Sequence, residues 1–221
     1  RVAVSKDTLK PTDNQILGEI LPSLNRAIES TDQRDITSSC MMAMAKIGRD
    51  TEEVKILPVF RQRLTRGDQE VRETAALALG LSAKPEAVDD LVALTKDSPK
   101  GRELCDRPQV DDRTRSFAAY GLGLVGYATS DNAIKRKALD AYKSILEDDT
   151  ISDRNIRVAV INACGLLRPV LTSQDGAEAE ADGKALFMAS LDALEAYWNL
   201  KLGAGQQLIQ SHCPPAIAKL Y

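Results

Sequence analysis

The sequence predicts an all-α protein built from a row of stacked, antiparallel helix pairs, and three observations support this fold class. Aromatic residues make up only 4% of the 221 residues, and the apolar positions are mostly Ala, Leu, Val and Ile, a composition that suits closely packed helices. Similar segments recur along the chain at intervals of 36 to 43 residues. Each interval holds two helical patterns.

The first helix of a unit is seen most clearly in two copies of one segment. "ILPSLNRAIESTDQ" at residues 20–33 lies over "ILPVFRQRLTRGDQ" at residues 56–69 at an offset of 36 residues. The apolar stripe of the overlapping segment "EEVKILPVFRQRLT" at residues 52–65, with one polar member, follows three-and-four spacing: Val54, Leu57, Phe60, Arg61 and Leu64. Pro22 and Pro58 fall at the same place in the two copies, and we expect each to bend its helix because proline lacks an N–H donor.

The second helix of a unit is rich in Ala and Gly. It reads "VRETAALALG" at 71–80, "TRSFAAYGLG" at 114–123 and "IRVAVINACG" at 156–165, with a looser first copy, "ITSSCMMAMA", at 36–45. Small side chains let helices approach closely. One unit alone could not bury its apolar face, so neighbouring units are expected to stack.

These second helices resemble those of the HEAT repeat family, which typically read Asp, a short gap, Val-Arg, then alanines and Leu-Gly. Two copies carry the pattern as Asp68, Val71, Arg72, Ala75, Ala76, Leu79, Gly80 and as Asp111, Arg115, Ala118, Ala119, Leu122, Gly123. A further copy keeps Asp153, Ile156, Arg157 and Gly165 but replaces the alanine pair by Val160 and Ile161, and the first copy has Thr37 in place of the arginine. The resemblance implies a right-handed α-solenoid of about four to five HEAT-like repeats.

The Asp and Arg of this pattern also have a direct physical interpretation. The pairs are Asp68 with Arg72, Asp111 with Arg115, and Asp153 with Arg157. Residues four apart share a helical face, and an acid is favourable at a helix start, so each pair is expected to form an ion pair. At one repeat spacing the pairs would build an electrostatic ladder between neighbours. The alternative, that the arginines bind an acidic ligand, is less favoured.

The repeats divide the chain into an array with two insertions. A polar segment occupies residues 1–12, the array covers 13–200, and 201–221 is expected to lead into further repeats. Insertions near 97–110 and 168–183 break the period, the first expected as a loop and the second as a flexible, acidic segment.

Three glycines spell a nucleotide-binding pattern. Gly121, Gly123 and Gly126 read G-x-G-x-x-G, and Asp140 follows at about the distance of a ribose-binding acid. A dinucleotide loop follows a strand, however, and here the preceding residues carry a helix start instead. We therefore interpret the glycines as close helix packing, with Gly126 ending the helix, and expect Gly121→Ala to be tolerated and no nucleotide to bind.

Few residues could carry catalysis. The single histidine, His212, adjoins Cys213, but adjacent side chains point apart on most backbones, so a structural role is favoured over a redox or ligand site. Cys40 and Cys164 align with helix-packing positions. Cys105 lies on the first insertion beside arginines, where its thiol pKa could be lowered, although an inert cysteine is favoured. No metal site is expected because four ligands at zinc spacing are missing.

Clusters of charge offer weaker alternatives. Acids gather in "EDDTISDR" at 147–154, where they are interpreted as helix-start residues. Bases gather in "IKRK" at 134–137 and in Arg61, Arg63 and Arg66, which could touch phosphates but are favoured as a solvated outer face. The net charge of -3 provides no overall field to attract nucleic acid.

The sequence therefore favours a non-enzymatic interaction or scaffold module that binds another protein through a curved solenoid surface. The candidate partner-binding residues are the bases of the first insertion and its flank: Lys100, Arg102, Arg107 and Arg113. We expect no cofactor, nucleic acid, small-molecule ligand or membrane insertion, and a cytoplasmic location. The alternatives are an accessory or lyase-type HEAT-like protein acting on a cofactor-bearing partner and, less favoured, a nucleic-acid-binding one.

Overall fold

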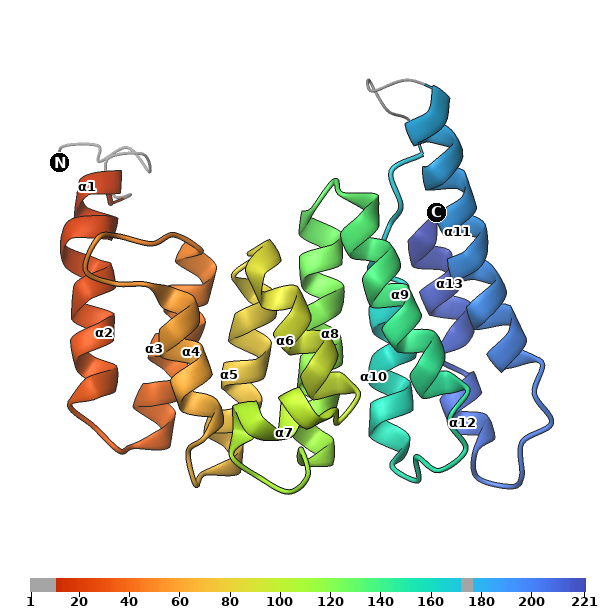
Figure 1. Ribbon diagram of the computed structural model, residues 1–221, viewed down its shortest axis with the longest axis horizontal. Coiled ribbons are helices and arrows are strands. Elements are labelled where there is room, and N and C mark those ends of the chain that lie inside the picture. The colour runs from red at the N-terminus through yellow and green to blue at the C-terminus, as the bar shows by residue number, and fades with distance from the viewer. Residues whose placement is uncertain (1–10, 172–176) are drawn as a thin grey trace, which may run out of the picture.

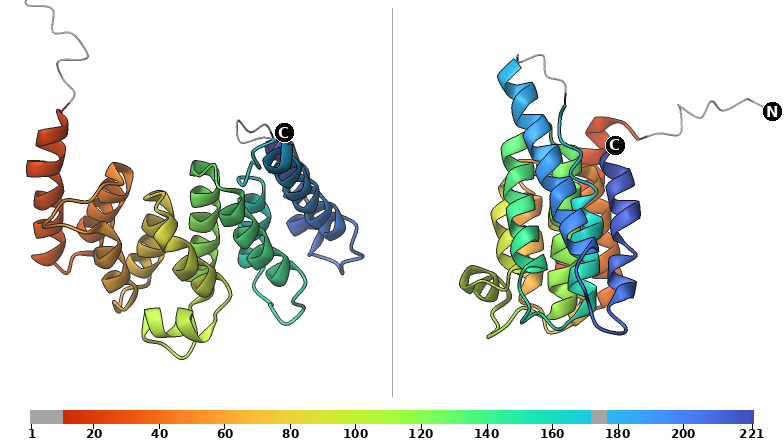
Figure 2. Two further views of the ribbon diagram at one scale, coloured as in Figure 1. Left: turned by 45° about the horizontal axis from the view of Figure 1, so that its top comes forward. Right: turned by 90° about the vertical axis from the view of Figure 1, so that its right-hand side faces the viewer.

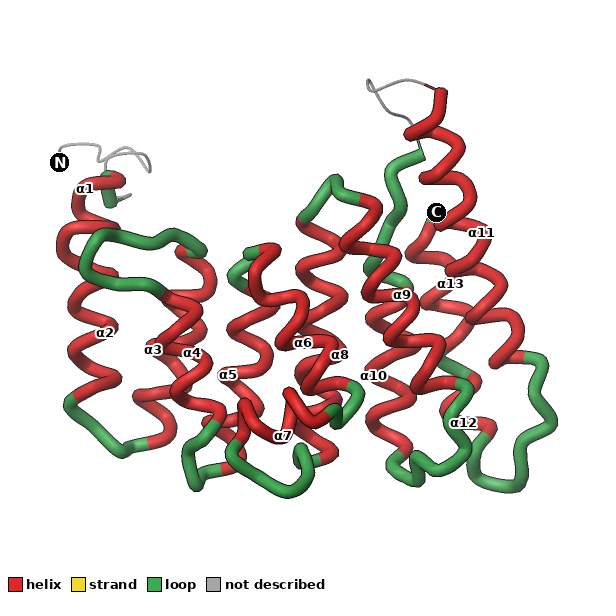
Figure 3. The backbone as a smooth tube through the Cα atoms, in the orientation of Figure 1, coloured by secondary structure: helices red, strands yellow, loops and turns green. Residues whose placement is uncertain are grey.

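The computed structural model describes residues 11–171 and 177–221, and within these ranges every regular element is a helix. Antiparallel helix pairs stand side by side in a row from the N-terminal to the C-terminal end (Figure 1). The backbone tube in Figure 3 shows how loops at alternate ends of the helices join them. The predicted all-α stack of helix pairs is confirmed.

The described residues form five pairs. The first helices are α2 (Leu21–Glu29), α4 (Ile56–Leu64), α6 (Val88–Thr95), α9 (Asn132–Leu146) and α11 (Ala177–Trp198). The second helices are α3 (Arg34–Ile47), α5 (Gln69–Leu81), α8 (Asp112–Ala128), α10 (Arg154–Cys164) and α13 (Cys213–Leu220). The short elements are α1 (Asp13–Gln15), the π-helical η2 (Ile16–Ile20), the 3-10 helix η3 (Pro85–Ala87), α7 (Pro99–Cys105) and α12 (Gln207–Gln210). Each first helix packs on its own second helix, and the second helices pack on one another in series.

Aspartates precede three of the five second helices. The Asp68 carboxylate accepts a hydrogen bond from the Val71 N–H at 3.1 Å, and Asp153 accepts from the N–H groups of Asn155 and Ile156 at 2.7 and 3.2 Å. These three bonds satisfy amides that the first helical turn leaves without partners. Asp111, at the equivalent position before α8, makes no such bond because its carboxylate is held by a side chain of the preceding repeat.

Glycines set the spacing between successive second helices. A Cβ added to Gly80 would lie 2.1 Å from the Cα of Gly121, and one added to Gly123 would lie 2.9 Å from the Cβ of Ala163. Gly165 likewise faces the carbonyl oxygen of Ala216 at 2.6 Å. Each glycine occupies the same place in its repeat. The hydrogen side chain is therefore a geometric requirement of the stack, because any larger group would meet the backbone of the next helix.

The predicted interchange of glycine and alanine at Gly121 meets a close contact in the structure. A Cβ on Gly121 would lie 3.0 Å from the carbonyl oxygen of Ala76, so this neighbour would have to shift by a few tenths of an ångström. Ala78 and Ala163 occupy the equivalent place in other repeats, and tolerance of Gly121→Ala stays a prediction. Gly126 does not end the helix either, since α8 continues to Ala128. The whole G-x-G-x-x-G pattern lies inside one helix with no strand before it, as the sequence interpretation required.

The two prolines differ in their effect. Pro58 is the third residue of α4, where the helix has no partner for its missing N–H in any case, so the predicted bend there is wrong. Pro22 follows the π-helical turn η2 directly at the start of α2. The irregular turn before Pro22 is the kind of local adjustment that a missing hydrogen bond brings about.

The insertions contain more regular structure than expected. The segment 97–110 is not a plain loop, because it forms helix α7, which projects from one edge of the row in Figure 2 (left). Helix α11 begins inside the predicted insertion 168–183, of which residues 172–176 lie outside the described residues. Within 201–221, α13 completes the fifth pair, so the stacked helices continue past residue 200. Of the segment 1–12, residues 1–10 also lie outside the described residues.

One apolar core runs along the row between the helices. Its fully buried side chains come from successive pairs, as Leu21, Phe60, Leu91, Leu122 and Tyr142 illustrate. The Tyr142 hydroxyl donates to the Ala119 carbonyl at 3.0 Å, which satisfies the polar end of the ring. No helix in the described ranges is long and apolar enough to cross a membrane.

We expect Gly80→Ala to lower the free energy of unfolding by about 1–3 kcal/mol or more, because the methyl group would overlap the backbone of Gly121. Urea denaturation followed by circular dichroism measures this change. Gly18→Ala is the matched control, since nothing lies within 4 Å of a Cβ at that site. Equal stability of the two variants would contradict the packing role of Gly80.

Candidate functional site

The four bases predicted to bind a partner are mostly engaged within the chain. Lys100 pairs with Asp90 at 2.7 Å, Arg102 with Asp97 at 2.8 Å and Arg113 with Glu73 at 2.9 Å. Arg107 is half-buried. Because three of the four charges are neutralised by nearby acids, they present little net positive charge to a partner.

Asp90 links three elements through these ion pairs. Its side chain is only 5% exposed, and it accepts from Arg61 of α4 at 2.6 Å as well as from Lys100 of α7. A nearly buried carboxylate is stable only when its charge is matched, and two bases match it here. The pairs therefore fasten α7 and α4 to α6.

Asp97 plays a similar part at the start of the insertion. Burial alone would raise the pKa of Asp97, but hydrogen bonds from the Arg102 guanidinium and from the Val110 N–H outweigh it and hold the pKa below its ordinary value. The Val110 bond, at 2.8 Å, closes the segment that contains α7. Asp97 thus holds both ends of the insertion together.

Of the predicted Asp/Arg ladder, one ion pair between neighbouring repeats is present, and the expected pairs within single helices are not. Arg72 donates to Asp111 of the next repeat through Nε and Nη2 at 2.9 and 2.6 Å, and its side chain is 4% exposed. The expected pair of Arg72 with Asp68 is wrong, because Asp68 caps its own helix instead.

The other two arginines of the predicted ladder bond to carbonyl groups. Arg115 donates to the Thr95 carbonyl at 3.1 Å and lies 3.5 Å from Asp112, and Arg157 donates to the Asp148 carbonyl at 2.9 Å. The expected pairs of Arg115 with Asp111 and of Arg157 with Asp153 are therefore wrong. All three arginines are buried, which supports a structural role over binding of an acidic ligand.

The interpretation of the basic runs as a solvated face is wrong for Lys135 and Arg63, whereas Arg66 is exposed. Lys135 is buried, its Nζ donates to the Arg168 carbonyl at 2.6 Å, and burial lowers its pKa. Arg63 is buried as well and donates to the Ile28 carbonyl at 3.3 Å. Arg136 and Lys137 form ion pairs with acids of other repeats. These bases hold the repeats together.

The surroundings of the cysteines disfavour reaction of their thiols. Burial raises the pKa of the Cys105 thiol to about 11, so the idea of a lowered pKa at this residue is wrong. Burial likewise raises the pKa of Cys164 to about 12 and that of Cys213 to about 11. Cys40 is buried too, and none of the four forms a disulfide.

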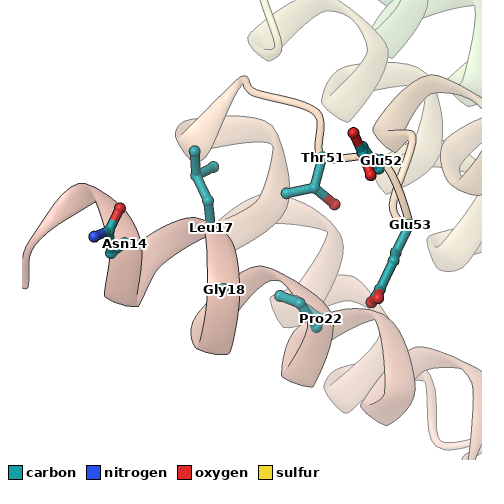
Figure 4. A pocket seen from close by; sticks show the side chains of 7 residues that line it. All are labelled: Asn14, Leu17, Gly18, Pro22, Thr51, Glu52 and Glu53. Atoms are coloured by element: carbon teal, nitrogen blue, oxygen red, sulfur yellow. The ribbon is translucent and has the colours of Figure 1, made fainter.

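Within the described ranges no group of three or more His, Cys, Asp or Glu side chains is placed to hold a metal ion. The acids of 147–154 serve the turn before α10: Asp148 accepts from Thr150, and Asp153 caps the helix. A hollow beside the first pair, of about 470 Å³, brings Glu52 and Glu53 near Leu17 and Pro22. Figure 4 shows the two glutamates extending in different directions, so they do not form a carboxylate pair for acid and base chemistry.

The one histidine belongs to a short polar chain across three repeats. The Nδ2 group of Asn162 lies 3.4 Å from the Tyr120 hydroxyl and 3.3 Å from Nδ1 of His212. It also donates to the Val158 carbonyl at 2.9 Å. The three side chains come from α8, α10 and the residue before α13, so they connect the outward sides of neighbouring second helices.

This polar chain lies within a larger, mostly apolar surface, the second-helix face. We define it by partly or fully exposed side chains of the second helices and the residues next to them. Phe117, Tyr127 and Val158 lie beside two sets that occupy equivalent places in three repeats: Leu77, Tyr120 and Asn162; and Leu81, Leu124 and Leu166. Most are half-buried, and Tyr127 is 53% exposed and stacks on Arg168 at 5.4 Å. A continuous surface of this kind can bind another macromolecule.

The sequence carries a signal for this surface in two aligned positions. Leu77, Tyr120 and Asn162 occupy one position of the aligned second helices, and Leu81, Leu124 and Leu166 occupy another four residues on. Both positions adjoin small or apolar residues that pack inward. Apolar and aromatic side chains recurring on the side away from the packing contact mark an outward, partner-accessible row.

Comparisons with known proteins agree with the helix-pair architecture. Residues 21–105 match the family model for HEAT repeats. Among solved structures, the complex of CpcE and CpcF of phycocyanin lyase from Nostoc sp. PCC7120 is similar, with 16% sequence identity and a TM-score of 0.53 over 89% of this chain and 96% of that one. An engineered protein is also similar, with 15% identity and a TM-score of 0.47 over 91% of this chain and 96% of its own. No curated protein sequence matches the chain.

The predicted HEAT-repeat resemblance is thus confirmed, and its sequence match covers residues 21–105. At 16% identity, the likeness to the lyase complex shows the shared fold alone.

We expect Asp97→Asn to lower the free energy of unfolding at pH 7 by about 1–2 kcal/mol, because the ion pair to Arg102 is lost. The folded pKa of Asp97 is depressed below the unfolded value of about 3.9. The wild-type advantage is therefore present above about pH 4 and lost as the pH falls through the folded pKa. Urea denaturation at pH 7 and pH 3 measures the difference. Asp106→Asn is the control. An equal difference in unfolding free energy between the wild type and Asp97→Asn at the two pH values would refute the role of Asp97.

We expect the four thiols to resist a disulfide reagent at pH 8 in the folded protein and to react promptly in denaturant, because all are buried. The raised pKa of Cys105, about 11, leaves almost no thiolate at this pH. The absorbance of the released thiolate reports the reaction. Reaction of Cys105 in the folded state at the rate of an exposed cysteine would restore the reactive-cysteine interpretation.

Proposed function

We propose that this chain, whose residues 21–105 match the HEAT-repeat model, is a non-enzymatic interaction module that binds another protein through the second-helix face. The observation that carries the proposal is the set of partly exposed, mostly apolar and aromatic side chains along α5, α8 and α10, two positions of which recur in all three helices. Tyrosine and phenylalanine are enriched in protein interfaces. Tyr120 and Tyr127 combine an apolar ring with a polar end, which suits recognition of a protein surface.

The construction of this face also favours binding. Its side chains stand on helices that are locked together by the glycine contacts, so few of them need to be ordered when a partner binds. A preorganised surface loses less conformational entropy on association and therefore gains affinity. The charged side chains of the repeats are largely paired within the chain, which makes the uncharged second-helix face the better candidate for partner contact.

The site chemistry supports a binding role over catalysis. The only histidine lies against Asn162, and the Cys213 beside it is buried with a raised thiol pKa. Neither arrangement is that of an activated nucleophile with its base. The buried, unpaired thiols also support the expected cytoplasmic location.

A second candidate is an accessory role toward a partner that carries a cofactor. The similarity to the CpcE and CpcF complex of phycocyanin lyase favours this candidate, although at 16% identity it rests on the shared fold. The two candidates differ in what the partner does. An accessory of a lyase would change the absorbance of the cofactor on its partner during incubation, whereas a scaffold would bind without such a change.

We expect the double variant Tyr120→Ala/Tyr127→Ala to bind its partner at least about tenfold more weakly, since interface tyrosines often contribute more than 1 kcal/mol each. The partner is first identified by affinity capture from the source cell and mass spectrometry, and its dissociation constant is then measured with purified proteins. Circular dichroism and thermal melting check that the variant is folded.

Leu208→Ala is the matched control, because this side chain is 70% exposed but lies outside the second-helix face. It should bind as the wild type does. If the tyrosine variant is folded and binds equally well, the partner uses another surface and the proposal fails.

A further inference from the structure

A groove runs between two first helices near the C-terminal end of the array. It has a volume of about 540 Å³ and is bounded by the end of α9 and the C-terminal half of α11. Helices α9 and α11 belong to the layer of first helices, so this groove is separate from the second-helix face.

Small residues on α11 keep the groove open. Ala189, Ala193 and Ala196 line it at three-and-four spacing and leave room that larger side chains would fill. Its apolar lining is completed by Leu146 and Tyr197, which are 7% and 3% exposed, and by Leu200, which is 47% exposed. The Tyr197 hydroxyl is buried without a hydrogen-bond partner among the described residues.

The rim of the groove carries uncompensated negative charge. Glu147, Asp149 and Asp192 are exposed lining residues, and none lies within 4 Å of a basic nitrogen in the described part of the chain. Lys143 is the only base among the lining residues. Most acids near α7, in contrast, are paired. Three acids against one base leave a net attraction for positive charge.

The shape of the groove selects for an elongated ligand. Its lining on α11 spans Ala189 to Tyr197, which corresponds to about 12 Å or slightly more than two turns of helix, and Leu200 beyond the helix extends it. A helix laid along such a groove can insert apolar side chains at three-and-four spacing. Basic side chains on its flanks would then meet the acidic rim, which gives electrostatic complementarity.

We propose that the α9–α11 groove docks an amphipathic helix of a partner protein, with Leu-like side chains in the groove and Lys or Arg side chains against Glu147, Asp149 and Asp192. The apolar floor supplies the affinity and the acidic rim fixes the orientation. This site is independent of the proposed function of the second-helix face, and it would let the module hold two segments at once.

The test uses a fluorescein-labelled helical peptide of about 18 residues made of Leu and Lys with one apolar face, measured by fluorescence anisotropy at about 0.15 M salt, where distant charges are screened. We expect micromolar binding to the wild-type protein. A Leu/Glu peptide of the same pattern should bind at least tenfold more weakly. Absence of binding by the Leu/Lys peptide overturns the proposal.

Two groove variants locate the binding. Ala193→Phe fills the groove, and Glu147→Lys/Asp192→Lys reverses the rim, and each should weaken Leu/Lys peptide binding at least tenfold. The matched control Glu52→Lys/Glu53→Lys reverses two exposed acids outside the groove and should leave binding within about twofold. Equal weakening by the control shows unspecific charge attraction and overturns the proposal.

Two further results separate this site from others. The Tyr120→Ala/Tyr127→Ala variant should bind the peptide as the wild type does, so that failure of the second-helix face and failure of the groove are distinguishable.

Size-exclusion chromatography with light scattering tests self-association. A wild-type dimer that Ala193→Phe converts to a monomer would mean that a second copy of the chain fills the groove, which overturns the partner-helix proposal. All variants are checked for folding by circular dichroism.

Discussion

The close approach of successive second helices is the constraint on which this structure depends. At Gly80, Gly123 and Gly165 the next helix lies so near that no Cβ fits without a shift. Packing at this distance fixes the spacing of the repeats, and the spacing in turn brings Asp111 within reach of Arg72 and Asn162 within reach of Tyr120. The outward rows of side chains are aligned because the inward contacts fall at equivalent places from repeat to repeat.

Charge in this molecule acts mainly between repeats. Arg72, Lys135 and Arg63 are buried, and each donates a hydrogen bond to a carbonyl or carboxylate group of another segment. Most bases of the runs that look like ligand-binding patches in the sequence therefore make their contacts within the protein. The second-helix face is mostly apolar and aromatic, while the rim between α9 and α11 keeps its acids free of ion pairs within the described residues.

The fold class and the helix pairs could be predicted from the sequence because they depend on local periodicity and on copies of one segment. The roles of Arg72 and Asp68 could not be predicted. An ion pair within one helix and an ion pair between repeats use the same residue types, and only the distance between helices decides which of the two forms. The favoured interpretation of Cys105 as inert is supported, because this residue ends α7 with its side chain buried, and burial outweighs the bases that lie near it in the sequence. Whether the bases Lys100, Arg102, Arg107 and Arg113 touch a partner stays a prediction, as does the role of the second-helix face.

The central claim, that contact at the glycine positions holds the stack together, is tested most directly by a double-mutant cycle across one contact. Gly123 faces Ala163, so the methyl group can be moved from one helix to the other with Gly123→Ala, Ala163→Gly and the double variant. Urea denaturation gives the three changes in unfolding free energy. The account predicts that the double variant is more stable than the sum of the single changes, by at least about 0.5 kcal/mol. Additive changes would show that the two positions do not compete for the same space and would contradict the claim.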